Sequence, residues 1–342
     1  MNSKITFFWF LIGFGIGFFI DLNKSNEFEV DLRKAPPSDL TQTSVVEDVK
    51  KIRILCFLST MSKSYSTRAV HIMQTWGKHC DKLLFFGSYV TDGNIGAIGF
   101  NVTEGHDYIW GKVKLIMQHI HKNFLNDYDW FFKGDDDTFL IPENLRYMLS
   151  AYSTDDPIYF GYKKNSSMHK RGFFSGGAGY VLSRQTVRTF VEKVLTNKEF
   201  YRKSEGEPGC NLKTDARNED EDISVCLDYY NVYPGDSRDL LNRGRFFPYK
   251  PEAHLFGKPD PKNGHWTTKY YWSDEGLDCC SNYTISFHYI LTKYQYTMYF
   301  LAYRLQPFGF RRHFPSLPMK VNFSQVVKML EQEGANASLR GF

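Results

Sequence analysis

Three consecutive carboxylates follow an apolar segment near the middle of the chain, in the stretch Trp130–Thr138. Ionised carboxylates packed this closely repel one another unless a cation neutralises them. Asp135 and Asp137 are alternate residues of an expected extended turn, so both can reach one ion while Asp136 points elsewhere. Their oxygen ligands favour a hard divalent ion, Mn²⁺ or Mg²⁺, which can then hold a diphosphate. A solvated acidic turn is the alternative, and we favour the metal site because the triplet directly follows a buried strand.

A second acidic cluster lies in the stretch Asn218–Cys226. Its first carboxylates, Glu219 to Glu221, are most simply part of a solvated loop. Asp222 stands just ahead of the apolar Ile223. It is either a cap at the start of a helix or a base that takes the proton from an acceptor hydroxyl while a sugar is displaced from a nucleotide.

A histidine and a glycine-rich loop are the remaining candidates for chemistry. His288 lies in the alternating segment Ser286–Tyr289, where a single histidine is more often structural. It gains a function if it completes the metal shell, because imidazole together with carboxylates suits Mn²⁺. The loop Ser175–Gly179 lacks the lysine and the spacing of a phosphate-binding loop. Its glycines instead predict a close approach of the backbone to a ligand or a neighbouring strand.

The composition is that of a folded protein with nearly balanced charge. The 342 residues include 42 Lys or Arg and 38 Asp or Glu, a net charge of +4, which excludes a protein whose main partner is nucleic acid. The hydrophobic fraction of 42% and the aromatic fraction of 17% are too high for a disordered chain. The aromatic residues also suit a sugar-binding surface, although most of them are expected in the core.

Strand and helix patterns alternate from Lys51 onward, which indicates an α/β domain with a largely parallel sheet. If the first two strands run parallel, Cys56 and Cys80 lie close enough to form a disulfide. Strands are expected at Lys51–Leu58, Lys82–Phe86 and Asp129–Lys133, and helices at Thr67–Trp76, at Trp110–Phe124 and from Pro142.

The N-terminal stretch Ile5–Ile20 carries no charged residue. As a helix it is roughly 24 Å long, enough for the thinner early secretory membranes. The positive-inside rule places the N-terminus in the cytosol and the rest of the chain in the lumen, as a single-pass type II protein. A cleaved signal peptide is the alternative, although no small-x-small site follows Ile20. The expected parts are a cytosolic tail (1–4), a transmembrane signal anchor (5–20), a stem (21–50), a catalytic domain (51–312) and a peripheral tail (313–342).

Two further patterns agree with a lumenal location. The six cysteines are an even number, as a disulfide framework requires, and their spacing fits no zinc template. Of their possible pairings only Cys56 with Cys80 is predicted. The cysteines are Cys56, Cys80, Cys210, Cys226, Cys279 and Cys280. Glycosylation sequons begin at Asn101, Asn165, Asn282, Asn322 and Asn336.

From Lys51 to about Phe310 the sequence resembles the core 1 β1,3-galactosyltransferases, within the wider group of β1,3-glycosyltransferases that includes the Fringe enzymes. The acidic triplet and a Glu-Asp pair belong to the whole group, whereas Gly-Asp-Ser-Arg-Asp and the Cys-Cys pair point to the core 1 branch. The matching stretches end at Cys56, Thr138, Gly161, Ser183, Asp222, Asp239, Ser281 and Tyr289.

The resemblance implies a GT-A fold, a Rossmann-like nucleotide-sugar transferase domain. It implies transfer of galactose from UDP-galactose to the 3-hydroxyl of O-linked GalNAc on Ser or Thr, with inversion, in the Golgi or between ER and Golgi. Asp135, Asp137 and His288 would hold Mn²⁺, and Asp222 would be the general base. Donor contacts would come from Ser59, Gly105, His106, Asp107, Asp135, His288 and Tyr289, and the acceptor sugar would stack on Trp266. Relatives form dimers, so a homodimer is expected.

The sequence departs from the family at three places. The family reads Glu-Asp, three residues, then Gly-x-Cys, whereas the segment from Asp222 to Cys226 is two residues shorter. His106 stands where relatives carry Arg, and Gly111 where they carry Lys, so the donor pocket loses positive charge unless Lys112 or Lys114 replaces it. Two alternatives follow: a transferase with another donor or acceptor, and an inactive relative that acts as a lumenal chaperone or scaffold.

Overall fold

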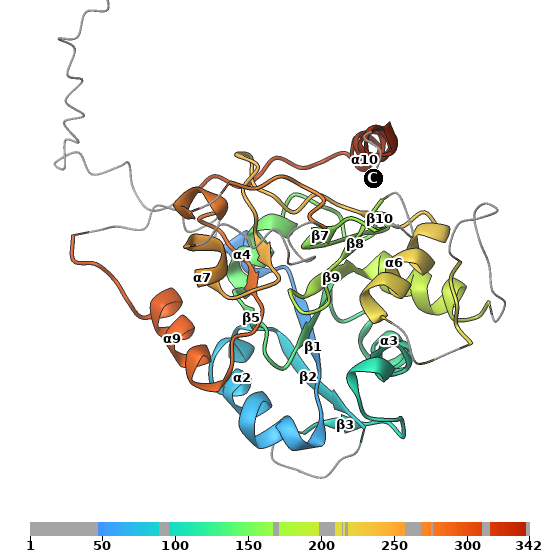
Figure 1. The fold of residues 1–342 in the computed structure, drawn as a ribbon, viewed down its shortest axis with the longest axis horizontal. Coiled ribbons are helices and arrows are strands. Elements are labelled where there is room, and N and C mark those ends of the chain that lie inside the picture. The colour runs from blue at the N-terminus through green and yellow to red at the C-terminus, as the bar shows by residue number, and fades with distance from the viewer. Residues whose placement is uncertain are drawn as a thin grey trace, which may run out of the picture. The chain divides into compact units, whose positions relative to one another are not determined.

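A seven-stranded sheet forms the centre of the protein in a computed structural model (Figure 1). The structure describes residues 47–88, 96–166, 171–197, 209–213, 215, 218–256, 268–274, 276–309 and 315–339. Among the described strands of this sheet, β9 runs antiparallel to its neighbours β4 and β6, and the other pairs are parallel. The strand order is β10 (Tyr233–Pro234), β6 (Ile158–Gly161), β9 (Tyr180–Ser183), β4 (Trp130–Asp135), β1 (Ile54–Ser59), β2 (Lys82–Gly87) and β3 (Ile98–Gly99).

Helices cover both faces of the sheet because the central strands are apolar on both sides. In β1, Ile54, Cys56 and Leu58 face one core, whereas Leu55 and Phe57 face the other. The first core is completed by α2 (Val70–Gln74), α4 (Pro142–Leu149) and α9 (Thr292–Tyr303), and the second by α3 (Ile109–Phe124), α5 (Arg184–Thr189) and α6 (Glu219–Tyr229).

A smaller sheet returns the C-terminal part of the chain to the end of β4. Its central strand β12 (Ser286–Phe287) pairs with β11 (Phe246–Phe247) in parallel and with β5 (Phe139–Leu140) in antiparallel orientation. This pairing brings the residue after β12 beside the turn that precedes β5. The remaining elements of the described ranges are β7 (Lys163–Lys164), β8 (Phe173–Phe174), α7 (Pro251–Leu255) and α10 (Phe323–Leu339), with 3-10 turns at Ser62–Ser64, Trp76–His79, His106–Tyr108 and Gly276–Cys279 and π turns at Tyr65–Ala69 and Phe190–Val194.

All six cysteines form disulfides. The predicted pair Cys56–Cys80 is confirmed, because β1 and β2 are adjacent parallel strands. The sequence left the other four unpaired, and the structure joins Cys210 to Cys226 and the neighbours Cys279 and Cys280.

The expected strands and the helices beginning near Trp110 and at Pro142 are present with small shifts of their ends. The helix expected at Thr67–Trp76 is α-helical only over Val70–Gln74, because the residues before it belong to the π turn Tyr65–Ala69. At its other end the Thr75 backbone leaves the helical conformation, and the Thr75 hydroxyl donates to the His71 carbonyl (2.7 Å). The segment expected as a peripheral tail contains α10, in which Leu330 is 5% exposed.

The predicted membrane span at 5–20 and most of the predicted stem lie outside the described residues. Within the described ranges, no helix has the length and apolar character needed to cross a membrane.

The predicted sequons differ in accessibility. Asn101, Asn282 and Asn322 are exposed. Asn165 is partly buried, and its side-chain amide donates to the Lys269 carbonyl (2.8 Å). The side chain of Asn336 lies outside the described residues.

Candidate active site

The acidic triplet occupies the turn between β4 and β5, at the carboxyl edge of the parallel strands, where ligands bind in open α/β sheets. Asp135 is the last residue of β4 and pairs in register with Ser59 at the end of β1. The Thr138 hydroxyl accepts from the Asp135 amide (2.9 Å), and the Thr138 amide donates to the Asp135 carbonyl (3.1 Å). This local bonding closes the turn and fixes the direction of its carboxylates.

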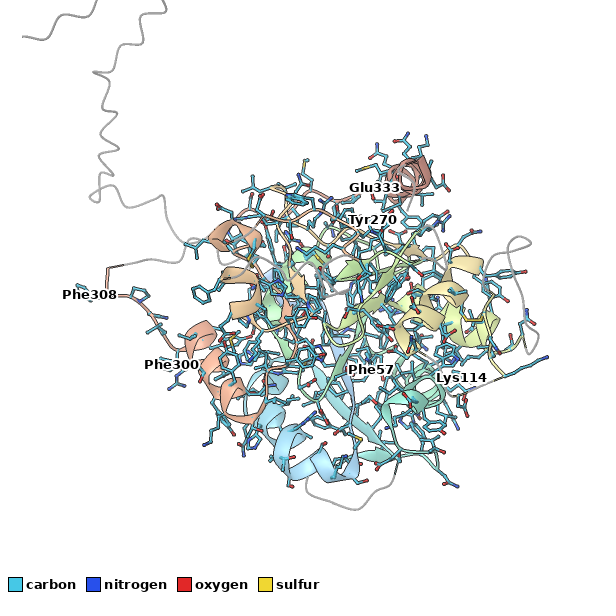
Figure 2. All side chains as sticks on the ribbon, viewed as in Figure 1. Phe57, Lys114, Tyr270, Phe300, Phe308 and Glu333 are labelled. Atoms are coloured by element: carbon cyan, nitrogen blue, oxygen red, sulfur yellow. A yellow bond between two sulfur atoms is a disulfide. The ribbon has the colours of Figure 1, made fainter. Side chains whose placement is uncertain are left out.

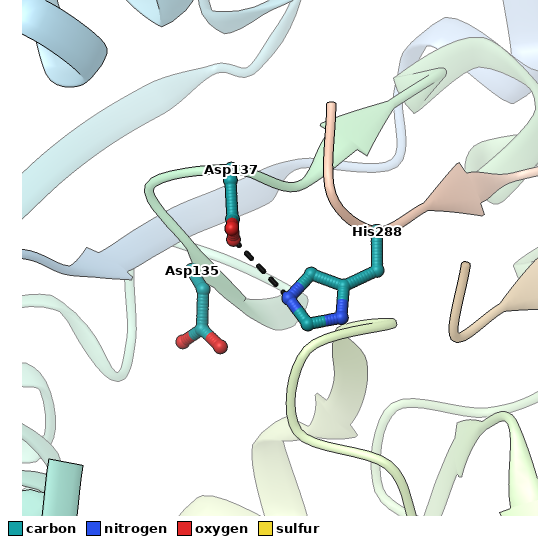
Figure 3. A group of neighbouring side chains, drawn as sticks. All are labelled: Asp135, Asp137 and His288. Atoms are coloured by element: carbon teal, nitrogen blue, oxygen red, sulfur yellow. Dashed lines mark ion pairs between the residues drawn. The ribbon is translucent and has the colours of Figure 1, made fainter. Parts of the chain in front are cut away.

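His288 reaches the turn because it directly follows β12. Its amide donates to the Phe247 carbonyl (3.1 Å), and the Ile290 amide donates to the Asp137 carbonyl (2.8 Å). Asp135, Asp137 and His288 therefore come together from two distant parts of the chain (Figure 3). One ligand atom from each lies within 4.8 Å of the others, and His288 Nε2 is 3.2 Å from Asp137 Oδ1.

This donor set fits a hard divalent cation. Two carboxylate oxygens and one imidazole nitrogen are ligands that Mn²⁺ accepts. Burial raises the pKa of the Asp137 carboxyl, but the hydrogen bond and the charge of His288 outweigh burial, so this pKa lies below its usual value. Asp137 is therefore held in the ionised form that a metal ligand requires.

Two backbone features make room for the histidine. A Cβ on Gly177 would lie 2.0 Å from the His288 ring, so the glycine-rich loop approaches the imidazole directly. Tyr289 has a φ of 58°, a left-handed conformation that is uncommon for a bulky residue, and its ring stacks on His288 at 3.8 Å. The predicted close approach of the glycine loop to a neighbouring strand is confirmed at Gly179, where a Cβ would lie 2.9 Å from the Lys133 carbonyl of β4. The conformation of Tyr289 gave no signal in the sequence.

Asp136 points away from the metal group, as the alternation predicts. It accepts hydrogen bonds from the Thr60 hydroxyl (2.7 Å) and from the Arg68 guanidinium (2.8 Å). Burial raises the pKa of Asp136 even though both partners oppose that rise. Arg68 also lies 3.8 Å from Asp137, so it places a positive charge at the edge of the metal group. Neither partner was identified from the sequence, since both lie far from the triplet along the chain.

A buried lysine connects the triplet to α6. Lys133 is 1% exposed, and its ammonium lies 2.9 Å from Asp135 and 3.4 Å from Glu219. Burial lowers the pKa of this ammonium, but the two carboxylates outweigh burial and hold the pKa above its ordinary value. Tyr180 donates its hydroxyl hydrogen bond to Glu219. Glu219 is therefore an internal ion-pair partner and not part of a solvated loop, which corrects the simple interpretation of this cluster.

The first turn of α6 presents two aspartates in different surroundings. Asp220 is partly exposed and accepts a hydrogen bond from the Gly176 amide (3.1 Å), one residue before the glycine that contacts His288. Asp222 is 1% exposed. Residues two apart on a helix point in nearly opposite directions, so the two side chains lie on different faces of α6, and the face with Asp220 contacts the glycine loop.

The predicted donor-binding residues gather at the same edge of the sheet. The Ser62 amide donates to Glu104 (3.1 Å), a hydrogen bond that joins the loop after β1 to the loop before α3. In the loop before α3, Gly105 has a φ of 142° and Asp107 is exposed. The side chain of His106, like the whole of the predicted acceptor residue Trp266, lies outside the described residues.

The lysines that could restore positive charge to the donor pocket are already engaged. Lys112 is buried and donates to the Thr60 carbonyl (3.2 Å), directly behind the acidic turn. Lys114 instead pairs with Asp215 (2.8 Å). A Cβ on Gly111 would lie 2.6 Å from Asp215, so the glycine at this position admits the Asp215 loop against α3.

Comparisons with known proteins agree with this geometry. The model of the Fringe-like family matches residues 49–215. The chain is 38% identical over 293 residues, 85% of this chain and 77% of that protein, to glycoprotein-N-acetylgalactosamine 3-beta-galactosyltransferase 1 of Xenopus laevis. It is 27% identical over 223 residues to a beta-1,3-glucosyltransferase of Homo sapiens, covering 64% of this chain and 41% of that protein. A chondroitin sulfate glucuronyltransferase of Homo sapiens is 30% identical over 138 residues, 39% of this chain and 17% of that protein.

The Fringe-like match includes the residues of the acidic turn. The similarity to the Xenopus protein covers more of the chain than the Fringe-like match does. The chain belongs to the Fringe-like family of glycosyltransferases and is an enzyme of that class.

Proposed function

We propose that the protein is a core 1 β1,3-galactosyltransferase, which transfers galactose from UDP-galactose to the 3-hydroxyl of O-linked GalNAc on Ser or Thr. The observation that carries this proposal is the 38% identity to the Xenopus galactosyltransferase over 85% of this chain. The joining of Asp135, Asp137 and His288 into one group supports it, because this chemistry needs a cation beside the leaving diphosphate.

The proposed setting is the Golgi or ER–Golgi lumen, with the chain held in the membrane by residues 5–20. The uncharged N-terminal stretch, the three exposed sequons and the three disulfides support this location. A homodimer is proposed only on the resemblance.

In the proposed reaction Asp135, Asp137 and His288 would hold Mn²⁺, which when bound would neutralise the charge on the departing UDP as a Lewis acid. The donor is contacted by residues at the sheet edge and in the loop before α3, namely Ser59, Gly105, His106, Asp107 and Tyr289. A carboxylate removes the proton from the acceptor 3-hydroxyl, and the hydroxyl oxygen attacks the anomeric carbon of the donor sugar. The bond between this carbon and UDP breaks at the same time, so the configuration at the carbon inverts.

We assign the base to Asp220 in place of the predicted Asp222. When Glu219-Asp220 is taken as the family pair, three residues separate it from Ser224-Val225-Cys226, and only the glycine is replaced. The apparent two-residue shortening then disappears. The contact of Asp220 with the Gly176 amide supports this register, because Gly176 directly precedes the glycine next to His288, whereas Asp222 is 1% exposed.

We predict that Asp220→Asn lowers kcat by about 100-fold to 10,000-fold, the usual contribution of general-base catalysis. The neutral amide keeps its hydrogen bond to Gly176, so binding of UDP in the presence of Mn²⁺ should persist. Asp222→Asn is the matched variant on the same helix turn and should change kcat by less than about tenfold. Steady-state kinetics of the two variants, with thermal unfolding as a check of folding, tests the assignment. A loss of kcat in Asp222→Asn alone would return the base to Asp222.

The proposed function itself is tested by product mass. The secreted lumenal part, residues 46–342, is incubated with a GalNAc-Ser/Thr peptide and a panel of UDP-sugars, with Mn²⁺ or with chelator. Addition of a hexose from UDP-galactose alone, only with metal, is the expected result. No transfer from any donor by the folded protein would favour the scaffold alternative, although the complete metal group argues against that alternative.

A second candidate is a transferase that uses another sugar donor. The ion pair between Lys114 and Asp215 favours this candidate. Because Asp215 neutralises Lys114, this lysine does not replace the positive charge that relatives carry at position 111 of the donor pocket. Transfer of a sugar other than galactose in the same panel would support this candidate.

A further inference from the structure

A lysine occupies a buried position in β4, the middle strand of the large sheet. Lys133 pairs in register with Phe57 of β1 and with Tyr180 of β9. Figure 2 labels Phe57, which is fully buried, and Lys133 is 1% exposed. Paired residues of adjacent strands point to the same face of a sheet, and Phe57 and Tyr180 belong to the apolar core on that face. A charged side chain at this position therefore needs a reason.

Stability alone is a weak reason for this charge. Taking an ammonium out of water is costly, and its attraction to buried carboxylates often fails to offset that cost. Well-packed apolar side chains of similar volume are therefore often as stable at such a place. An apolar side chain offers no hydrogen-bond donor, however, so it cannot hold carboxylates in fixed positions. The contacts of the Lys133 ammonium therefore indicate what the charge does.

The Lys133 ammonium contacts three separate parts of the site. It lies 2.9 Å from Asp135 Oδ1 at the end of its own strand, and 3.4 Å from Glu219 Oε2 in the first turn of α6. It also donates to the Gly176 carbonyl (3.4 Å) in the glycine loop. An ammonium has three N–H donors, so it can serve all three contacts at once. Asp135 is a candidate metal ligand, and Glu219 directly precedes the proposed base Asp220.

The glycine loop extends these contacts to both sides of the site. The Gly176 carbonyl accepts from Lys133, and the Gly176 amide donates to Asp220 (3.1 Å). A Cβ on the next residue, Gly177, would lie 2.0 Å from the ring of His288, the second element that supplies the metal group. A displacement of the ammonium would therefore reach the metal group and the proposed base together.

We infer that Lys133 is a positioning residue that keeps the metal group and the first turn of α6 in a fixed relation to each other. Its ammonium holds the Asp135 carboxylate and, through Glu219, the turn that carries Asp220. A cation at Asp135 would share the charge of that carboxylate and leave the ammonium more strongly attracted to Glu219. Metal binding is then coupled to the order of α6. This inference rests on the proposed function only in that Asp220 is the base.

The test removes the ammonium without leaving a buried carboxylate unpaired. Lys133→Met combined with Glu219→Gln replaces both members of the ion pair, because loss of Lys133 alone would strongly destabilise the protein. Amide hydrogen exchange is measured on the full chain without metal and at saturating Mn²⁺. In the wild type, Mn²⁺ should slow exchange in the first turn of α6 by about 5-fold or more, the lower end of couplings between two sites. In the double variant this effect should fall below about twofold.

Two further variants make the result specific. Glu219→Gln alone is the milder change and should also reduce the effect of Mn²⁺ on α6 below about twofold, because the charge that attracts the ammonium is lost. Lys163→Met is the matched control. Lys163 is also a buried lysine, 5% exposed, but its ammonium donates to the Pro234 carbonyl (3.4 Å) and lies 4.0 Å from the centre of the Tyr270 ring. Its loss should leave the full effect of Mn²⁺ on α6.

Kinetics give a second readout that a merely structural role would not move. At saturating Mn²⁺ and donor, the double variant should lower kcat by up to about 100-fold, the effect of a small misplacement of a reacting group. Adding Asp220→Asn to the double variant should then cost much less than it costs in the wild type, because both changes act on the same base.

The outcomes separate this inference from the proposed function. Amide exchange with Mn²⁺ needs no sugar, so transfer of a sugar other than galactose overturns the proposed function alone. Equal slowing of α6 by Mn²⁺ in the wild type and in both Glu219 variants, each folded by thermal unfolding, overturns the positioning role. Loss of the effect in Lys163→Met as well overturns it too, because any buried ammonium would then do the same. Fully additive losses of kcat with Asp220→Asn would separate Lys133 from the base and overturn the coupling.

Discussion

Asp137→Asn is expected to reduce sugar transfer by about 100-fold or more. It should also weaken Mn²⁺ binding by at least about 10- to 100-fold, the effect of losing a group that supports a metal ligand. The amide keeps the size of the side chain but removes the negative charge that a divalent cation requires. It also removes the carboxylate that contacts His288, whose Nε2 lies 3.2 Å from Asp137 Oδ1. Two of the three candidate ligands are therefore affected by one substitution. The measurement is a Mn²⁺ titration by calorimetry, with transfer followed separately.

The matched control for this prediction lies in the same turn. Asp136→Asn removes one carboxylate charge as well, but Asp136 is turned toward Thr60 and Arg68. Its Mn²⁺ affinity should fall by less than about tenfold, because only the longer-range charge is lost. Equal losses in the two variants would mean that the turn binds metal through its total charge. Full Mn²⁺ affinity in Asp137→Asn would remove Asp137 from the site.

Local sequence patterns predicted the parts of the site that lie on one strand. An apolar strand that ends at Asp135, with Asp137 in the turn that follows, places both carboxylates at the sheet edge, and the alternation turns Asp136 away. The same reasoning paired Cys56 with Cys80, because adjacent parallel strands fix the distance between them. In each case the relevant geometry is set by neighbours in one or two strands.

Tertiary contacts determined what the sequence could not predict. Arg68 lies 68 residues before Asp136, and no periodicity links them. The acidic run from Glu219 to Asp222 has the composition of a solvated loop, yet Lys133 and Tyr180 enclose Glu219 from other strands. The resemblance took Glu221-Asp222 as the family pair; the spacing to Cys226 fits the earlier pair, and the contact of Asp220 with Gly176, which only the structure shows, is the second observation that favours it. The contact of α10 with Tyr271 through Glu333 was also not predicted, because the C-terminal tail has only a weak sequence pattern.

Gly177→Ala is expected to displace the His288 ring and weaken Mn²⁺ binding by about 10- to 100-fold, the range found when a group that orients a metal ligand is lost. The added Cβ would lie 2.0 Å from the ring, and all three nearest atoms belong to His288. The His288 ring has little room to move, because Tyr289 stacks on it at 3.8 Å and the His288 amide donates a hydrogen bond to the Phe247 carbonyl. The methyl group is small, so the fold itself should persist.

The neighbouring glycine provides the control for Gly177→Ala. A Cβ on Gly176 would lie 3.1 Å from Glu219 and 3.3 Å from Lys133. Gly176→Ala therefore adds a steric contact with these two side chains and not with the His288 imidazole. A double-mutant cycle then isolates the cause. If Gly177 acts only by admitting His288, adding Gly177→Ala to His288→Ala should weaken Mn²⁺ binding no further. Additive losses in the double variant would mean that Gly177 acts on the metal group by another route, and the steric account of this loop would fail.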